Sequence, residues 1–398
     1  MIGCTKLICG TATLAEAINY SQSGGRAPAH MLQFTTSDRP LVVWNMTRRC
    51  NLKCLHCYIS ASDEATDELS TEEAGAFIRD IGKMGCPVLI FSGGEPTLRE
   101  DLCELGTLAV ESGLRAVISS NGTTIYADLA GRIAEAGFSY VGVSLDGAPE
   151  THDRFRGRKG AFEEALRGVR HCLDAGIKTG IRFTVNRANV QDLPQVLDIV
   201  EREGIPRFCM YHLVYSGRGA EMIEQDLSHR QTRDVVKLLI DKVLDWEEGG
   251  VKTEILTTDN HADGVIVENF VRENRPERQE DVSALQKRHG GCSAGKKMAN
   301  VDHAGNVHPC QFWSGDTLGN VRERPFSEIW TDGSDPLLAK LRDMPGSLTG
   351  PRCSRCRHNA VCGGCRIRAQ VVNGDLWGDD PACYLTDEEI GVREEVPE

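Results

Sequence analysis

The sequence predicts an α/β fold, in which a partial (β/α)6 barrel of the TIM type is followed by a small cysteine-rich domain. Two observations predict the barrel: six short apolar, β-branched runs recur from residue 41 onward, and longer segments with helical periodicity separate them. A third predicts the second domain, since seven of the 16 cysteines fall between residues 292 and 383. The expected domains are an N-terminal extension over 1–40, the barrel over 41–225, a helical bridge over 226–289 and the cysteine-rich domain over 290–398.

Each expected strand is a short run followed by polar residues or a turn. The strands lie at 41–45, 87–93, 115–120, 140–145, 178–185 and 207–214. The first crossover helix is predicted to begin at Ser70, because Glu73 three residues later completes a capping box. Six such units are too few for a closed eight-stranded barrel, so we expect an open one with reactive groups on the loops after the strand ends.

The composition is that of a globular chain, with 40% hydrophobic and 26% charged residues. The formal net charge of −13 argues against nucleic acid or an anionic membrane surface as a partner, because both bind basic patches. No apolar stretch approaches the roughly 18 residues of a membrane span, and the N-terminal residues carry no signal-peptide core. We therefore expect a cytoplasmic protein with no membrane partner.

Three cysteines fall within one short loop after the first expected strand. Cytosolic thiols are kept reduced, so a group of cysteines there indicates metal ligation rather than disulfides. Cys50, Cys54 and Cys57 can hold three corners of a cubane iron–sulfur cluster, and the missing fourth ligand leaves one iron open to an external ligand. The alternatives are a zinc site or a chance cluster of buried cysteines, but structural zinc needs four protein ligands.

The spacing C-x3-C-x2-C after the first barrel strand resembles the defining motif of the radical S-adenosylmethionine superfamily. The resemblance implies an iron–sulfur enzyme in which Cys50, Cys54 and Cys57 hold a [4Fe-4S] cluster whose open iron is chelated by S-adenosylmethionine. It also implies residues that bind this cosubstrate: His56, Gly93, Gly94, Glu95, Ser120, Asn121, Ser144 and Asp146. Glycines allow close approach of the backbone to a ligand, and Glu95 can accept a hydrogen bond from an ammonium group. For each residue taken alone, a plain turn or strand cap is the alternative.

The C-terminal cysteines form two sets. Two CxxC pairs are separated by only five residues, whereas a zinc ribbon separates its pairs by roughly 15–20. The layout resembles the SPASM extension of radical S-adenosylmethionine enzymes, which implies a small iron–sulfur domain with one or two auxiliary [4Fe-4S] clusters. By that resemblance the ligands of one cluster are Cys353, Cys356, Cys362 and Cys383, and those of the other are Cys292, Cys310 and Cys365. The second set has three ligands, so it is site-open, completed by a non-cysteine ligand, or absent.

Longer strings resemble one branch of this superfamily, the tetrapyrrole-modifying radical enzymes. They lie at the start of the chain and at 212–219, 258–264 and 319–326. The resemblance implies removal of acetate side chains from 12,18-didecarboxysiroheme to give Fe-coproporphyrin III in haem biosynthesis, through a 5′-deoxyadenosyl radical. It also implies a low-potential electron donor such as ferredoxin or flavodoxin.

Basic residues on or after the fifth and sixth expected strands are candidates to bind a substrate with several carboxylates. They are Arg182, Arg207, His212 and Arg218. Arginine is well shaped to grip carboxylates, and salt bridges at the barrel rim are the alternative for each. His261 lies between two aspartates and can serve as an acid, a base or an iron ligand, with an ordinary polar loop as the alternative. We predict a catalytic role for His212, Arg218 and His261, and interpret Arg156 as structural.

Other functions stay open. The haem d1 branch acts on propionate side chains of the same precursor, and a SPASM peptide maturase modifies a ribosomally made peptide. Such maturases usually carry a winged peptide-binding region, for which the forty residues before the first strand are short. An electron carrier or a zinc scaffold needs neither an open iron site nor the Gly93-Gly94-Glu95-Pro96 loop.

Overall fold

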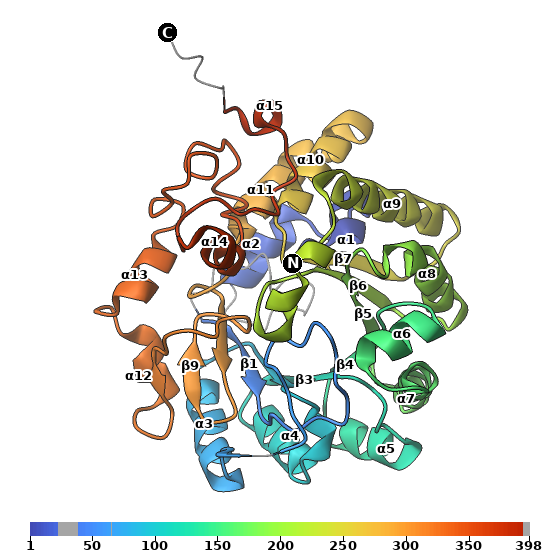
Figure 1. The fold of residues 1–398 in the computed structure, drawn as a ribbon, viewed down its shortest axis with the longest axis vertical. Helices are drawn as coiled ribbons and strands as arrows, with labels where there is room; N and C mark the ends of the chain where they lie inside the picture. The colour runs from blue at the N-terminus through green and yellow to red at the C-terminus, as the bar shows by residue number, and fades with distance from the viewer. Residues whose placement is uncertain (23–38, 65, 393–398) are drawn as a thin grey trace.

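A ten-stranded sheet forms the centre of the computed structural model, which describes residues 1–22, 39–64 and 66–392 (Figure 1). Its strands are β1 (Leu41–Asn45), β2 (Val88–Ser92), β3 (Arg115–Ser120), β4 (Tyr140–Ser144), β5 (Thr179–Val185), β6 (Arg207–His212), β7 (Glu254–Thr258), β8 (Met298–Val301), β9 (Asn306–His308) and β10 (Gly319–Asn320). Strands β1 to β7 pair in sequence order, and all are parallel. The predicted open barrel is therefore confirmed, while part of the expected N-terminal extension, 23–38, lies outside the described residues.

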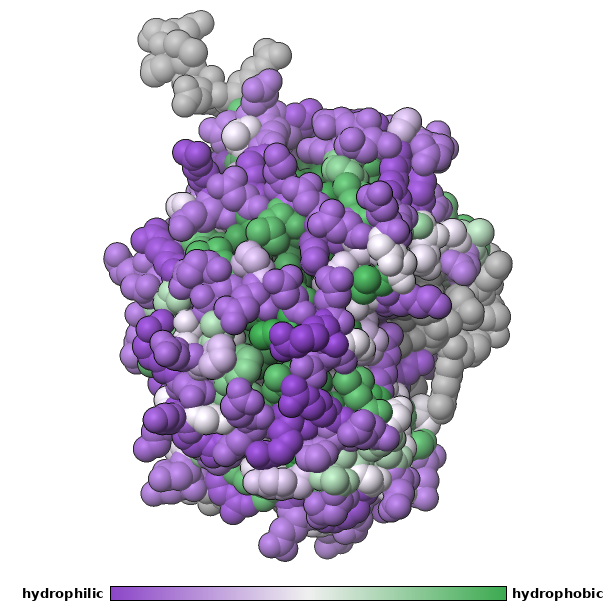
Figure 2. Space-filling model, turned by 90° about the vertical axis from the view of Figure 1, so that its right-hand side faces the viewer, coloured by the Kyte–Doolittle hydropathy of each residue, from purple (hydrophilic) through white to green (hydrophobic). Residues whose placement is uncertain are grey.

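Crossover helices cover the outer face of the sheet (Figure 1). They are α3 (Thr71–Met84), α4 (Leu102–Glu111), α5 (Ala127–Glu135), α6 (Pro149–Arg156), α7 (Ala161–Asp174), α8 (Leu193–Arg202) and α9 (His229–Glu248). The predicted capping box opens α3, where Ser70 Oγ accepts a bond from the Glu73 amide and Glu73 accepts one from the Ser70 amide. Figure 2 shows the side that carries α6 to α9 as mostly hydrophilic, with apolar side chains reaching the surface in between.

Alternate strand residues face the inside of the barrel and are only half-buried. In β3 the exposure alternates residue by residue, with Ser119 among the more exposed positions. Arg182 in β5 and Tyr211 in β6 likewise lie half-buried between buried neighbours. Arg182 donates a hydrogen bond to Ser119 across the intervening strand β4, so these side chains point into the same space. We call this space the barrel lumen.

The segment 226–289, expected to be a helical bridge, contains a seventh barrel strand. β7 pairs in parallel with β6. Its sequence, EILTT, gives little signal because it is short and follows the 20-residue helix α9. Contacts distant in sequence hold it in place: Ile2 and Thr257 exchange backbone hydrogen bonds of 2.6 and 2.9 Å. The rest of the segment is helical, with α10 (Ala262–Asn274) and α11 (Gln279–His289).

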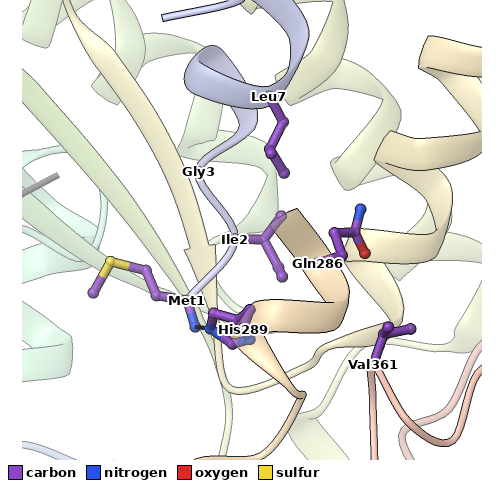
Figure 3. Close-up of a pocket in the computed structure, with 7 residues that line it drawn as sticks. All are labelled: Met1, Ile2, Gly3, Leu7, Gln286, His289 and Val361. Carbon is purple, nitrogen blue, oxygen red and sulfur yellow. Dashed lines mark hydrogen bonds between the residues drawn. The ribbon is translucent and has the colours of Figure 1, made fainter. Parts of the chain in front are cut away.

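The N-terminal segment packs beside β7, α10 and α11. Helices α1 (Cys4–Cys9) and α2 (Leu14–Gln22) follow Ile2, and Lys6 forms a 3.0 Å ion pair with Glu254. A small pocket lies between this segment and α11. Its lining residues are Met1, Ile2, Gly3, Leu7, Gln286, His289 and Val361 (Figure 3). Figure 3 shows the Met1 amino group directed at the His289 ring, whose Nε2 lies 3.4 Å away.

The cysteine-rich region extends the barrel sheet beyond β1. Strand β8 pairs in parallel with β1, and β9 and β10 continue the sheet antiparallel to their neighbours. Four short helices follow: α12 (Phe326–Thr331), α13 (Pro336–Arg342), α14 (Arg366–Asn373) and α15 (Asp387–Ile390). This region has a small apolar cluster of its own, which includes Cys310, Leu341 and Met344. In the described part of the chain, no helix has the length and apolarity that a membrane span requires.

Candidate active site

The three cysteines of the first motif lie together on the loop after β1. Cys50 and Cys57 pack against a small cluster formed by Cys54, Leu52 and Ala161, and all three thiols are free. Backbone amides support two of the sulfurs, because Leu52 donates to Cys50 Sγ at 3.4 Å and Ala61 to Cys57 Sγ at 3.3 Å. Within the described residues no three His, Cys, Asp or Glu side chains form a site for a single metal ion. Free thiols with N–H donors fit a cubane, which takes each thiolate on a different iron.

A buried ion pair lies beside the second cysteine. Arg156, at the end of α6, has its Nη1 3.4 Å from Cys54 Sγ and donates from Nη2 to Asp146. Asp146 is fully buried and also accepts a bond from the Thr184 amide at 2.7 Å. Burial is the largest single effect and opposes the charge of this carboxylate, yet Arg156, His56, His152 and the Thr184 amide together outweigh burial and lower the pKa of Asp146. Arg156 therefore places a positive charge against a candidate cluster sulfur, which the sequence interpretation of Arg156 as structural did not include.

The glycines after β2 allow two loops to touch. A Cβ on Gly94 would lie 2.2 Å from the Arg49 carbonyl oxygen, and one on Gly93 would lie 2.4 Å from that of Thr47. The Gly94 amide donates to the Thr47 carbonyl at 2.8 Å. Glycine is needed here because the backbone just before Cys50 passes through the space that a side chain would fill. Sequence analysis had assigned that close approach to a ligand.

Glu95 ties the end of β3 to the same loops. Its buried carboxylate accepts bonds from Ser120 Oγ at 2.8 Å and from the Asn121 amide at 2.7 Å. Thr97 Oγ1 donates to it at 2.6 Å. Burial raises the pKa of Glu95. The Asn121 side-chain nitrogen lies 3.9 Å from Cys50 Sγ, so three of the predicted cosubstrate residues gather beside the cysteine loop.

His56 and Ser144 complete the predicted cosubstrate set. The His56 ring stacks on Phe155 with the ring centroids 4.6 Å apart, and its Nε2 lies 4.0 Å from Asp146. Burial lowers the pKa of His56 to about 4, so this ring is neutral at pH 7. Ser144 is half-buried at the end of β4, where it pairs in register with Arg182. The eight predicted residues thus follow the ends of β1 to β4 around one loop.

His212 belongs to a buried chain of three polar side chains. Its Nε2 lies 2.8 Å from Asp263 Oδ2, and the Tyr384 hydroxyl donates to Asp263 Oδ1 at 2.7 Å. Asp263 and Tyr384 are partners that sequence analysis did not select, although Asp263 falls in the singled-out string 258–264. His261 is half-buried, its ring 5.4 Å from that of His289, and burial lowers its pKa to about 3. Both histidines lie on loops or strand ends after β6 and β7.

Arg218, the third predicted catalytic residue, lies against the cysteine loop. It belongs to the 3-10 helix η4 (Gly217–Gln225) and donates to the backbone oxygens of Cys54 at 2.8 Å and Ala61 at 3.0 Å. Its hydrogen-bond partners are thus carbonyl groups of the loop that holds the cysteines, and not His212 or His261. The arrangement fits a residue that fixes the shape of this loop.

The remaining two basic candidates differ in their partners. Arg207 donates to Glu254 from Nη2 at 2.5 Å and from Nε at 2.9 Å. Arg207 therefore forms a salt bridge at the barrel rim, which is the alternative to substrate binding. Arg182 donates to Ser119 Oγ, and no carboxylate among the described residues pairs with it. Of these two arginines, Arg182 is therefore the one with N–H groups free to bind a substrate.

Four cysteines of the C-terminal region line one pocket. They are Cys353, Cys356, Cys362 and Cys383. All four are free thiols, and the His358 amide donates to Cys356 Sγ at 3.3 Å. These are the four residues that the sequence assigns to one auxiliary cluster, and their shared cavity fits such a group.

Cys292, Cys310 and Cys365 lie next to this first set. The Cys292 amide donates to the Cys362 carbonyl at 3.0 Å. Burial, and then the neighbouring thiols of Cys292 and Cys365, raise the pKa of Cys310 well above its usual value. The Cys365 amide donates to Asp380 at 2.7 Å. The three thiols therefore face a common region, which fits the second predicted set without supplying a fourth cysteine.

Comparison with known families agrees with this geometry. Residues 44–200 match the Radical SAM superfamily, and residues 292–365 match the SPASM iron–sulfur cluster-binding domain. The chain is 51% identical to the Fe-coproporphyrin III synthase of Methanosarcina barkeri, over 99% of this chain and 100% of that one. It is 46% identical to the pre-heme d1 synthase of Dinoroseobacter shibae, over 90% of each chain. The chain belongs to the radical SAM superfamily, and it is a radical SAM iron–sulfur enzyme with a SPASM domain.

Solved structures share the fold. SuiB of Streptococcus suis bound to S-adenosylmethionine superposes with a TM-score of 0.70 at 18% identity, covering 87% of this chain and 78% of that chain. The anSMEcpe structure with bound AdoMet gives 0.67 at 19% identity, covering 88% and 95%. The radical SAM domain binds a [4Fe-4S] cluster and S-adenosylmethionine, and the SPASM domain binds auxiliary iron–sulfur clusters. The free thiols of the two regions fit these groups.

Proposed function

We propose that this enzyme removes acetate side chains from 12,18-didecarboxysiroheme to give Fe-coproporphyrin III in haem biosynthesis. The 51% identity to an Fe-coproporphyrin III synthase along the whole of both chains carries the proposal. Two AdoMet-dependent heme synthases, 35% and 33% identical, support tetrapyrrole chemistry more broadly. We also propose a cytoplasmic location. The proposed electron donor is ferredoxin or flavodoxin, because reduction of such a cluster requires a low potential.

Each predicted ligand has a proposed place in this reaction. Cys50, Cys54 and Cys57 hold the cluster that, with S-adenosylmethionine, supplies a 5′-deoxyadenosyl radical. The cosubstrate is bound by the residues at the ends of β1 to β4, which are His56, Gly93, Gly94, Glu95, Ser120, Asn121, Ser144 and Asp146. The auxiliary clusters are held by the two C-terminal sets: Cys353, Cys356, Cys362 and Cys383 in one, and Cys292, Cys310 and Cys365 in the other.

The barrel lumen is the proposed substrate site. Tyr58, directly after Cys57, donates to Asn45 at 2.7 Å, and its ring meets Phe312 of the SPASM region edge-on at 5.5 Å. Ser216 also donates to the Phe312 carbonyl at 2.8 Å, so the SPASM region contacts the loops at this end of the barrel, and we propose that it covers the substrate site. Such a cover excludes water from a reactive intermediate.

His212 is the proposed acid or base of the reaction. Its Nε2 shares a proton with Asp263 at 2.8 Å, while the Tyr384 hydroxyl fixes the carboxylate. His261 lies on the adjacent loop, and because burial lowers its pKa to about 3 it is a weak base and neutral at pH 7, which suits the proposed alternative of an iron ligand better than that of a proton acceptor. Arg218 contributes by holding the loop carbonyls of Cys54 and Ala61.

Product analysis tests this function. The protein, reconstituted with iron and sulfide without oxygen, is incubated with dithionite, S-adenosylmethionine and didecarboxysiroheme. We expect 5′-deoxyadenosine and Fe-coproporphyrin III by liquid chromatography and mass spectrometry, and neither from the Cys50→Ala variant. If the substrate is recovered unchanged while 5′-deoxyadenosine accumulates, the substrate assignment is wrong.

The haem d1 branch is the second candidate, because the identity of 46% to a pre-heme d1 synthase is close to that of the first relative. The same experiment separates the two. A product that keeps its acetates and loses propionate side chains assigns the chain to the haem d1 branch instead.

A further inference from the structure

Most of the buried cations around the barrel have carboxylate or backbone carbonyl partners within the protein. Arg156 pairs with Asp146, and Arg207 pairs with Glu254. Arg218 donates to two backbone carbonyls of the cysteine loop. Arg182 differs, since among the described residues it forms neither an ion pair with a carboxylate nor a hydrogen bond to a backbone carbonyl, and only Ser119 Oγ accepts from it. Partly burying a guanidinium that has no negative partner costs free energy, unless a ligand supplies the negative charge.

The Arg182 side chain extends inside the barrel lumen from β5 across β4 toward β3. In β5 it pairs in register with Ser144 of β4 and with Cys209 of β6. The side chain then passes over Gly142, where a Cβ would lie 2.9 Å from Arg182 Nε. Its Nη1 reaches Ser119 Oγ on β3. A glycine in the middle of β4 thus gives the guanidinium room to lie inside the barrel instead of leaving it.

Arg182 is held in this position by aromatic and hydroxyl neighbours. Its Cζ lies 5.4 Å from the centroid of the Tyr211 ring, which is within the range of a cation–π contact. One N–H is used by Ser119, and none of the Arg182 nitrogens is a buried donor without a partner in the described residues. Because its other nitrogens have no hydrogen-bond partner among the described residues and are not fully buried, they are accessible to a ligand. A planar donor group fixed on one side and open on the other suits a carboxylate, which it can bind through two parallel bonds.

We propose that Arg182, supported by Ser119 and Tyr211, forms a subsite that binds a carboxylate side chain of the substrate inside the barrel lumen. This inference rests on the proposed function, because the tetrapyrrole substrate and product both carry propionates. The Arg182 backbone pairs in register with Ser144, which belongs to the predicted cosubstrate set, and its guanidinium lies two residues further into the barrel, at Gly142 and Ser119. Binding one carboxylate there orients the macrocycle relative to the cysteine loop.

Binding of a product and its ester tests the subsite. Fe-coproporphyrin III and its tetramethyl ester are titrated separately, without oxygen and without reductant, into the reconstituted wild-type protein and the Arg182→Gln variant. We expect the wild type to prefer the acid, and Arg182→Gln to weaken acid binding by about 10- to 100-fold, as for a lost charge-assisted hydrogen bond. Ester binding should be equal in the two proteins. Equal dissociation constants for the acid in wild type and Arg182→Gln would overturn the subsite.

Two further variants keep the test clear. Arg182→Lys retains the charge but loses the planar guanidinium, so acid binding should fall less than in Arg182→Gln. If Arg182→Gln fails to fold, the comparison of Arg182→Lys with the wild type still tests the subsite. Arg170→Gln removes an exposed cation paired with Glu203 on the outer surface, and its acid binding should equal that of the wild type. If the wild type converts didecarboxysiroheme but none of these variants changes acid binding, the subsite is wrong and the proposed function stands. If the wild type neither binds nor converts a tetrapyrrole, the proposed function is wrong.

Discussion

At Cys54 a single arginine connects the cysteine loop to the carboxylate of Asp146, which follows β4. Asp146→Asn leaves Arg156 buried without its counter-charge, and breaking one side of a buried pair costs about 3–5 kcal/mol. We expect the free energy of unfolding to fall by that order. We also expect less iron to be retained after reconstitution, because Arg156 no longer has a fixed position beside the sulfur. Denaturant unfolding and iron analysis measure the two effects.

The control for this variant is Asp241→Asn, which changes an exposed aspartate on the outer surface of α9. It should unfold and bind iron as the wild type does. Equal iron content in Asp146→Asn and wild type would show that the pair does not position the cysteine loop.

The motif cysteines could be predicted from spacing because their chemistry depends on residues a few positions apart. Arg156 could not be assigned to Cys54 in this way, since 102 positions separate the two residues and only the fold brings them together. The same holds for Asp263 and Tyr384, which are 121 positions apart. Local patterns therefore indicate which residues can do chemistry, while their partners depend on tertiary contacts.

Among the elements, the turn after β2 has no space for a side chain at Gly94. Gly94→Ala would place a methyl group 2.2 Å from the Arg49 carbonyl oxygen, and this neighbour is backbone that cannot rotate away. We expect the cysteine loop to be displaced and most of its cluster to be lost. Absorbance and electron paramagnetic resonance of the reconstituted, reduced protein measure the loss.

Gly131→Ala is the matched control for this element. No atom outside the local helix lies within 4 Å of a Cβ there, and the position is inside α5. It should keep the cluster and gain up to about 1 kcal/mol of stability, because alanine is the better helix former. A Gly94→Ala protein with a wild-type cluster signal would contradict the bracing role of this turn.

Glu254 links β7 to three basic residues, Lys6, Lys178 and Arg207. Burial opposes its charge, yet Arg207 and Lys6 outweigh burial and lower the pKa of Glu254 to about 2, from 4.5. A folded-state pKa below the unfolded one adds stability that is present above pH 4.5 and is lost as the pH falls toward 2. Glu254→Gln should lower the free energy of unfolding at pH 7 by about 2–3 kcal/mol.

The pH dependence distinguishes this ion network from a packing effect. The difference between Glu254→Gln and wild type should shrink between pH 4.5 and pH 3, measured by denaturant unfolding of cluster-free protein. Glu135→Gln, an exposed change at the end of α5, should show no difference at either pH. A constant difference at both pH values would assign the effect to packing.

The barrel strands were predictable to different degrees. The bounds of β1 and β3 equal the expected ones, because each is a compact apolar run between clear turns. β7 and β8 to β10 were not predicted, since each is short and is stabilised mainly by pairing with strands that are distant in sequence. A two- to five-residue strand carries too few positions for a period of two to stand out.

At the scale of the whole molecule, one buried arginine of the SPASM region joins that region to the barrel. Arg368 in α14 is fully buried and contacts both oxygens of Asp380 at 2.9 Å. The same guanidinium donates to the carbonyls of Leu213 at 3.1 Å and Asp259 at 2.7 Å, which follow β6 and β7. Asp380 in turn accepts a bond from the Cys365 amide. The position of the auxiliary cysteines relative to the barrel therefore depends on this arginine.

Arg368→Gln should uncouple the two regions. The Asp380 carboxylate loses its buried counter-charge, so we expect the free energy of unfolding to fall by about 3–5 kcal/mol. Hydrogen exchange should rise around Leu213, Asp259 and Cys365, and iron content should fall because the auxiliary thiols lose their fixed position. Arg230→Gln, whose side chain is 92% exposed on α9, should leave both measurements unchanged. If exchange rises throughout the chain and not at these three places, Arg368 stabilises the fold as a whole and does not specifically join the SPASM region to the barrel.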